Sequence, residues 1–198
     1  SPKSGENEIL SLDKLSKAFD LKDVNKAGAK FNWEKLNWIN SQYIKNMDPK
    51  DLFKIFKIFW EKEEWEIPSQ QWGLNLTLLI QDSTIVLKEV IDQSKPFFKV
   101  PEVDNKGVDF LKNNDAKFLL KNVIDLLSKK SQSINRKDAK DIIGEISTKD
   151  KIKKGIIMKT LRVAFFGCLS GPDLIESWVL LSEKGEDIPR LRRCLDII

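Results

Sequence analysis

The chain has 198 residues, of which 41% are hydrophobic and 32% charged, and its formal net charge is +4. No apolar run approaches the roughly 18 residues that span a membrane, and the absence of histidine removes the commonest general base and the commonest neutral metal ligand. Two cysteines, Cys168 and Cys194, are too few for a disulfide framework or a zinc site, so we expect a reduced binding module with no catalytic residue and no metal of its own.

Helical periodicity runs along most of the sequence, and no strand pattern of comparable length competes with it. Asp48 followed by Pro49 predicts the start of a helix, because a capping carboxylate and a proline suit its first positions. The clearest amphipathic pattern runs from residue 116 to 127, with apolar residues on one face and polar residues on the other. In chain order, helices are predicted over residues 33–45, 49–61, 70–80, 86–93, 116–127, 136–147, 158–166, 172–181 and 189–195. The predicted fold class is therefore all-α.

Prolines and short polar segments divide this helical pattern. Residues 96–105 contain Pro96 and Pro101 and show no helical period, so they are predicted to separate two helical units. Residues 131–133 and 149–154 are predicted loops within the second unit. The first five residues hold neither an initiator methionine nor a signal sequence, which predicts a fragment of a longer polypeptide.

Positive charge is concentrated between Lys129 and Arg162, where eleven Lys and Arg accompany four Asp and Glu. This segment is net +7, so the rest of the chain is net negative. A basic surface here would suit a polyanion such as RNA. The alternative is a solvated helix face with a Lys-rich linker, and the rarity of arginine beside lysine weakens lysine abundance as an indication of RNA binding.

A small corner between two predicted helices suits contact with RNA. Gly167 is predicted to end one helix, Pro172 fits the first turn of the next, and the residues between them have little side-chain bulk. Arg162, shortly before Gly167, offers a planar face and several donors to an unstacked base. The N–H groups of the next helix would favour a phosphate. The alternative is an ordinary helix-loop-helix with a surface arginine.

Three segments resemble the bacterial-type glutamyl-tRNA synthetase family. They are the junction motif within residues 26–44, whose core is Lys35-Leu36-x-Trp38-x-Asn40-x-x-Tyr43-Ile44, the segment 87–98, and residues 155–176, which include Thr160-Leu161-Arg162. The resemblance covers essentially the whole chain. It implies the C-terminal part of the synthetase, with the end of a stem-contact domain and the junction motif in residues 1–46 and two all-helical anticodon-binding subdomains in residues 47–104 and 105–198.

The resemblance also implies that tRNA binding and catalysis belong to different domains of one polypeptide. This part would bind the anticodon arm of glutamate tRNA, while an N-terminal catalytic domain uses ATP and Mg²⁺. The family's histidine-containing nucleotide motif is missing here, and Lys14-Leu15-Ser16-Lys17, which spells the core of its second signature, is interpreted as a coincidence. We therefore expect no cofactor in this chain, no membrane partner, and a bacterial cytoplasm or an organelle stroma as its compartment.

The residues expected to read the tRNA follow from the same resemblance. Arg162 matches the arginine that helps read the anticodon, although Thr160 stands where the family element has a proline. Gly171 and Leu174 match positions that contact anticodon bases. No residue of the segment 81–87 aligns securely with the family's reader of the first anticodon base, so the charging of glutamine tRNA stays open. Possible contacts with the tRNA backbone are Lys159, Arg190, Arg192, Arg193, Lys35, Asn40 and Tyr43.

Several alternatives remain compatible with the sequence. The terminal arginines could form a solvated helix face, and the junction-motif residues could pin one domain to the next. The six tryptophans and eleven phenylalanines could line the partner groove of a helical protein-interaction scaffold with a non-specific basic surface. An independent enzyme would need a catalytic acid–base pair, and no spacing in this chain singles one out.

Overall fold

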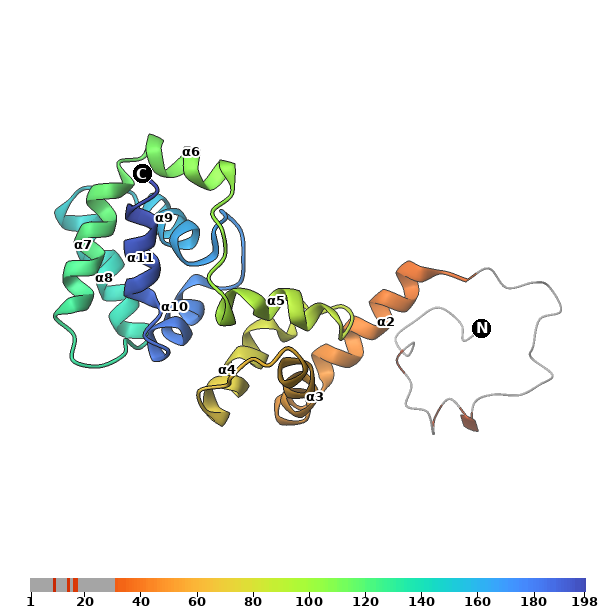
Figure 1. Cartoon of the computed structure of the whole chain (residues 1–198). Helices are drawn as coiled ribbons and strands as arrows, with labels where there is room; N and C mark the ends of the chain where they lie inside the picture. The colour runs from red at the N-terminus through yellow and green to blue at the C-terminus, as the bar shows by residue number, and fades with distance from the viewer. Residues whose placement is uncertain (1–8, 10–13, 15, 18–30) are drawn as a thin grey trace.

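A computed structural model describes residues 9, 14, 16–17 and 31–198, and it shows ten α-helices and no strand between residues 31 and 198 (Figure 1). The all-α prediction is confirmed. Residues 26–30 of the junction motif and residue 15 of the Lys-Leu-Ser-Lys tetrad lie outside the described residues. The helices are α2 (Trp33–Asn46), α3 (Pro49–Lys62), α4 (Gln70–Gln81), α5 (Glu89–Phe98), α6 (Asn105–Asn113), α7 (Ala116–Ser128), α8 (Arg136–Lys149), α9 (Lys154–Phe166), α10 (Leu174–Glu183) and α11 (Asp187–Leu195).

Helices α3, α4 and α5 pack together around an aromatic core. Trp60 is fully buried there and donates its indole N–H to Ser94 Oγ at 2.9 Å, which satisfies the one polar atom of the side chain. Helix α2 leads into this group. Gln81 at the end of α4 donates to the backbone oxygens of Ile44 and Met47 at 2.9 and 3.0 Å, so a side chain holds the C-terminal end of α2 in place.

Helices α6 to α11 form a second group, in which α9 contacts α6, α7, α8, α10 and α11. Helix α8 begins with a capping box: Asn135 accepts from the N–H of Asp138, and Asp138 accepts from the N–H of Asn135. The apolar face predicted for α7 is buried as expected, and it comprises Ala116, Leu119, Leu120, Val123, Ile124 and Leu127.

The two groups meet where α4 lies against α10. Trp72 of α4 is fully buried and donates its indole N–H to the backbone oxygen of Leu180 at 2.9 Å. Apolar side chains of both groups form one continuous buried cluster. The assignment of domain boundaries at residues 46 and 104 stays a prediction. No helix in the described part of the chain is both long and apolar enough to cross a bilayer.

The structure corrects the expected boundary between the two units. Helix α5 begins at Glu89 rather than at residue 86 and continues to Phe98, with Pro96 inside its last turn. A proline is tolerated here because it removes only one N–H close to the helix end, and the N–H of Lys99 still closes the turn on the oxygen of Lys95 at 2.8 Å. The irregular connector is therefore shorter than the predicted 96–105, and it spans residues 99–104.

Helix α6 is absent from the sequence-based prediction. Its segment is polar and contains Gly107, which lowers intrinsic helix propensity. The structure supplies other stabilisation: Asp104 Oδ1 accepts from the N–H of Gly107 at 2.6 Å, and Leu111 is buried. A Cβ at Gly107 would lie 2.8 Å from Val163 of α9, so the glycine permits close packing of the two helices.

Three further helix starts differ from the expected ones. Helix α9 begins at Lys154, inside the expected loop 149–154, and α11 begins at Asp187 rather than at residue 189. Neither helix has a side-chain cap hydrogen bond, so the sequence carries no start signal. Helix α10 begins at Leu174 after the capping residue Asp173, so Pro172 precedes the helix instead of opening its first turn.

The two cysteines differ in accessibility, and this gives a pH-dependent prediction. Cys194 is buried, which raises the pKa of its thiol to about 11, whereas Cys168 is only partly buried. At pH 8, therefore, only about one thousandth of the Cys194 side chains carry the reactive thiolate. We expect iodoacetamide to modify Cys168 well before Cys194 in the native protein, and both at similar rates in denaturant. Equal native rates, measured by mass spectrometry, would contradict this placement.

Candidate nucleic-acid interface

The corner predicted between two helices is formed by the end of α9, the segment 167–173 and the start of α10. Gly167 ends α9 in the left-handed conformation, with φ of 72°, and its N–H donates to the oxygen of Val163 at 2.8 Å. Only glycine adopts this conformation without cost and also leaves room for the connector between the two units. A Cβ at this position would lie 2.0 Å from the backbone oxygen of Glu102.

Arg162 lies on the last turns of α9 and is half-buried. Its Nη1 donates to the backbone oxygen of Pro172 at 2.7 Å. Among the described residues this is the guanidinium's one hydrogen bond, so the other N–H groups of the fork have no partner within that part of the protein. The contact with Pro172 ties the guanidinium to the loop between α9 and α10.

Gly171 is the loop residue beside that guanidinium. It is exposed, its φ is 147°, and a Cβ there would lie 3.2 Å from Arg162 Nη1. The absence of a side chain therefore leaves the face of the loop open next to the arginine. The structure brings Arg162 and Gly171 together as expected, while their contact with bases stays a prediction.

Thr160 occupies the middle of α9 and is fully buried, and its hydroxyl has no partner in the described residues. A proline at this interior position would remove a backbone donor from the helix. Threonine keeps that donor, so the helix that carries Arg162 continues without a break.

The start of α10 corrects two expectations about RNA contact. Leu174 is 1% exposed and packs in the core, so its side chain presents no surface to a base, and we drop it from the site. The helix N-terminus also has acidic groups of its own. Asp173 accepts from the N–H of Glu176 at 3.0 Å, and Glu176 carries a second negative charge in the first turn. Asp173 therefore occupies a helix N–H and places a carboxylate where the phosphate was expected, although the charge of Glu176 is offset by its pair with Arg136.

Three exposed cations on α9 and α11 were expected to contact the tRNA backbone, and they differ in the contacts they already make. Lys159, one turn before Arg162, is exposed, and its Nζ lies 5.9 Å from the centre of the Phe110 ring. Arg192 is exposed on α11, and Arg193 is exposed but donates to the oxygen of Pro101 at 2.6 Å. Lys159 and Arg192 therefore remain candidates for phosphate contact.

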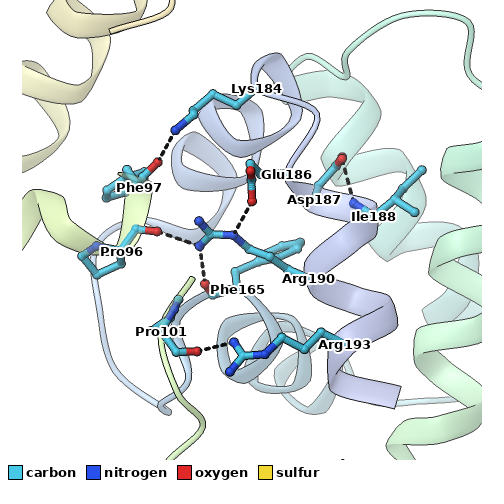
Figure 2. Close-up of polar contacts among 10 residues, drawn as sticks. All are labelled: Pro96, Phe97, Pro101, Phe165, Lys184, Glu186, Asp187, Ile188, Arg190 and Arg193. Atoms are coloured by element: carbon cyan, nitrogen blue, oxygen red, sulfur yellow. Dashed lines mark hydrogen bonds and ion pairs between the residues drawn. The ribbon is translucent and has the colours of Figure 1, made fainter. Parts of the chain in front are cut away.

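Arg190 was expected to contact the tRNA backbone, but the structure shows that it is buried. It is 2% exposed, and its Nη1 donates to the backbone oxygens of Pro96 and Phe165 at 2.6 and 2.8 Å (Figure 2). A guanidinium enclosed by protein carbonyls cannot reach a phosphate on the surface. The sequence pattern misses this because the carbonyl groups that hold Arg190 are far from it along the chain.

The junction-motif residues lie elsewhere. Lys35, Asn40 and Tyr43 are all on α2, which extends from the α3–α5 group on the side away from α9 (Figure 1). Lys35 and Tyr43 are exposed, and Asn40 is half-buried. The structure does not bring them together with Arg162, so any RNA contact by α2 would belong to a separate part of the surface.

The basic segment 129–162 is partly neutralised within the protein. Lys130 pairs with Asp138, and Arg136 Nε lies 2.7 Å from the carboxylate of Glu176. The hydrogen bond from Lys130, with a second from the backbone of Asn135, holds the pKa of Asp138 below its usual range. The net +7 of this segment therefore overstates the positive charge that it offers to RNA.

The first unit carries a groove of about 1010 Å³ between α3 and α4, which sequence patterns do not indicate. Lys50, Lys54 and Lys57 line it from α3. Lys54 is paired with Asp51 and Lys57 with Glu61, so we do not assign the groove to RNA. No group of His, Cys, Asp and Glu side chains among the described residues could hold a metal ion.

Comparison with known proteins matches this helical arrangement. A family model described as an anticodon binding domain matches residues 34–195. The glutamate–tRNA ligase of Prochlorococcus marinus (strain MIT 9215) is 55% identical across the whole of this chain, which spans 42% of that relative's length. A crystal structure of a glutamate tRNA ligase from Elizabethkingia meningosepticum, in complex with its amino acid, gives a TM-score of 0.83 at 26% identity and covers 94% of this chain and 37% of the other.

A glutamate-tRNA synthetase from Elizabethkingia anophelis gives a TM-score of 0.74 at 26% identity, with 94% of this chain and 36% of the other covered. The chain thus spans less than half of the length of the relatives it matches. The predicted family is confirmed: this chain belongs to the anticodon-binding domain family, in the form found in glutamate–tRNA ligases.

Proposed function

We propose that this chain is the tRNA-binding module of a glutamate–tRNA ligase and that it recognises the anticodon arm of glutamate tRNA. The catalytic domain of the same polypeptide would activate glutamate with ATP and Mg²⁺ and transfer it to the tRNA end. This module selects and positions the tRNA and makes or breaks no bond itself. Cytoplasm or an organelle stroma is the compartment that this function requires.

One observation carries the proposal: Arg162 is oriented by the oxygen of Pro172, at 2.7 Å, beside the exposed Gly171. Single-stranded bases are recognised by stacking on flat groups and by hydrogen bonds to their edges. A planar guanidinium tied to the loop by one N–H, with further donors left over, provides both. Lys159 on the same helix face would add a phosphate contact, which contributes affinity without discrimination between bases.

Substituting Arg162 by alanine tests this role. We expect binding of an anticodon stem-loop of glutamate tRNA to weaken by roughly tenfold to a hundredfold, because one base contact is worth about 1–3 kcal/mol. Binding of a stem-loop with an altered anticodon should weaken much less. Both affinities can be measured by fluorescence anisotropy at one fixed salt concentration.

Arg162→Lys is the matched variant, because it keeps the charge and loses the planar fork. It should retain general affinity and lose most of the preference for the cognate anticodon. Equal losses for both RNAs in Arg162→Ala would reduce Arg162 to a phosphate contact and would contradict the proposed role.

A further inference from the structure

Three cations, one that caps the C-terminal end of α10 and two from α11, hold the backbone that links the two helical units (Figure 2). We call Lys184, Arg190 and Arg193 the cationic clamp. Lys184 Nζ donates to the oxygen of Phe97 at 2.9 Å, and Arg193 Nη1 to the oxygen of Pro101 at 2.6 Å. The cationic clamp belongs to the second unit, and the backbone carbonyls that accept its hydrogen bonds in α5 and the connector are those of Pro96, Phe97 and Pro101.

Arg190 is the centre of the cationic clamp. Its Nη1 donates both to Pro96 in the last turn of α5 and to Phe165 in the last turn of α9. The last carbonyls of a helix lack intrahelical partners and carry partial negative charge. A single guanidinium therefore serves two helix ends, one from each unit.

The chemistry of this position favours arginine over lysine or an apolar residue. Burial lowers the pKa of the Arg190 guanidinium, and the carboxylate of Glu186, 3.5 Å from Nε, opposes that effect. The arginine fork can direct N–H groups at two carbonyls and a carboxylate at once, whereas lysine presents one point charge. An apolar residue here would leave the buried carbonyl of Phe165 and the partly buried carbonyl of Pro96 without this donor, which is costly.

The connector held in this way passes directly over the end of α9. The N–H of Asp104 donates to the oxygen of Gly167 at 2.8 Å, and the oxygen of Glu102 occupies the space where a Cβ of residue 167 would lie. Phe165, which accepts from Arg190, is one turn after Arg162 on the same helix. The cationic clamp and the proposed reading loop therefore share the last turn of α9.

We propose that Arg190 is a positioning residue for anticodon recognition: it fastens α5 to α9 and so fixes the Arg162 loop relative to the first helical unit. The fastening itself does not depend on the function proposed above, whereas its effect on recognition rests on that function. Arg190 touches no RNA in this role.

The fastening is tested by trypsin cleavage of the whole chain after Lys99, which lies in the connector. Mass spectrometry follows the appearance of the new terminus at Val100. We expect Arg190→Met to raise the initial rate of this cleavage at least about tenfold, because two hydrogen bonds from a charged donor are lost, one buried and one partly buried. Arg190→Lys should give an intermediate rate, since one of the two carbonyls can keep a donor. Lys62→Met, which removes a charge from the exposed end of α3, is the matched control and should leave the rate unchanged.

The effect on recognition is tested with the same variants and a pair of stem-loops, one with the glutamate anticodon and one with an altered anticodon. The ratio of the two dissociation constants should fall in the order wild type, Arg190→Lys, Arg190→Met, while far-UV circular dichroism stays unchanged. A folded Arg190→Met protein that is cleaved as slowly as the wild type would overturn the fastening. Faster cleavage with an unchanged ratio would overturn the positioning role. If the wild-type protein binds both stem-loops with equal dissociation constants, the proposed function is refuted. The cleavage result would still test the fastening of α5 to α9 independently.

If Arg190→Met does not fold, two other members of the cationic clamp keep the fastening testable. Arg193→Met and Lys184→Met each remove one hydrogen bond at the surface or at its edge. Each should accelerate cleavage after Lys99 by about threefold to tenfold. Unchanged cleavage in both would overturn the fastening.

Discussion

Replacing Trp72 by alanine is expected to lower the free energy of unfolding by about 3–5 kcal/mol. The indole of Trp72 is fully buried where α4 meets α10, so its loss leaves a large cavity between the two units. It also leaves the oxygen of Leu180 without the donor that it now has at 2.9 Å. Urea unfolding followed by circular dichroism gives the free energy, and the transition should lose cooperativity because the units separate.

Trp33→Ala is the matched control, because the same side chain is removed from a surface position. Trp33 is 70% exposed on α2, and its ring contacts Phe31 at a centroid distance of 4.7 Å. Removal should cost no more than about 1 kcal/mol. Similar losses for the two variants would mean that Trp72 does not join the units as the structure shows.

Gly167→Ala should destabilise the protein by about 2–4 kcal/mol although it adds one methyl group. The residue has a φ of 72°, which L side chains rarely adopt, and a Cβ would lie 2.0 Å from the oxygen of Glu102. The obstructing atom belongs to the backbone, so the connector itself has to move. The hydrogen bond from Asp104 to Gly167 would then be lost or lengthened.

Gly144→Ala, in contrast, is expected to stabilise the protein. Gly144 is inside α8, and a Cβ there would have no atom within 4 Å. Alanine should therefore stabilise the helix by about 0.5–1 kcal/mol. Thermal unfolding of the two variants should shift in opposite directions, and a destabilising effect at both glycines would contradict the distinction drawn from their surroundings.

Much of the helical arrangement could be predicted from sequence periodicity. The starts of α3 and α7 and the buried face of α7 follow from local patterns that the tertiary structure does not override. Helix α6 could not be found in this way, because its stability comes from the Asp104 cap and from packing of Gly107 against Val163. The continuation of α5 through Pro96 could not be predicted either, since the end of α5 is held by Lys184, which follows α10, and by Arg190 of α11.

The candidate site shows the same division between local and long-range information. The proximity of Arg162 and Gly171 follows from their closeness in sequence and from the helix end at Gly167. The burial of Arg190 could not be inferred, because its acceptors at Pro96 and Phe165 come from two other helices. A cation at an amphipathic helix is ordinarily exposed, and only the tertiary fold shows that this one is enclosed.

The anticodon preference of the chain is the measurement that tests the central claim most directly. Dissociation constants are measured for the anticodon stem-loop of glutamate tRNA and for versions with each anticodon base changed, at two salt concentrations. We predict that affinity falls at higher salt for every RNA, because phosphate contacts release counterions, while the preference for the cognate anticodon persists. Equal binding of all the stem-loops, lost together at higher salt, would contradict anticodon recognition and leave only a basic surface.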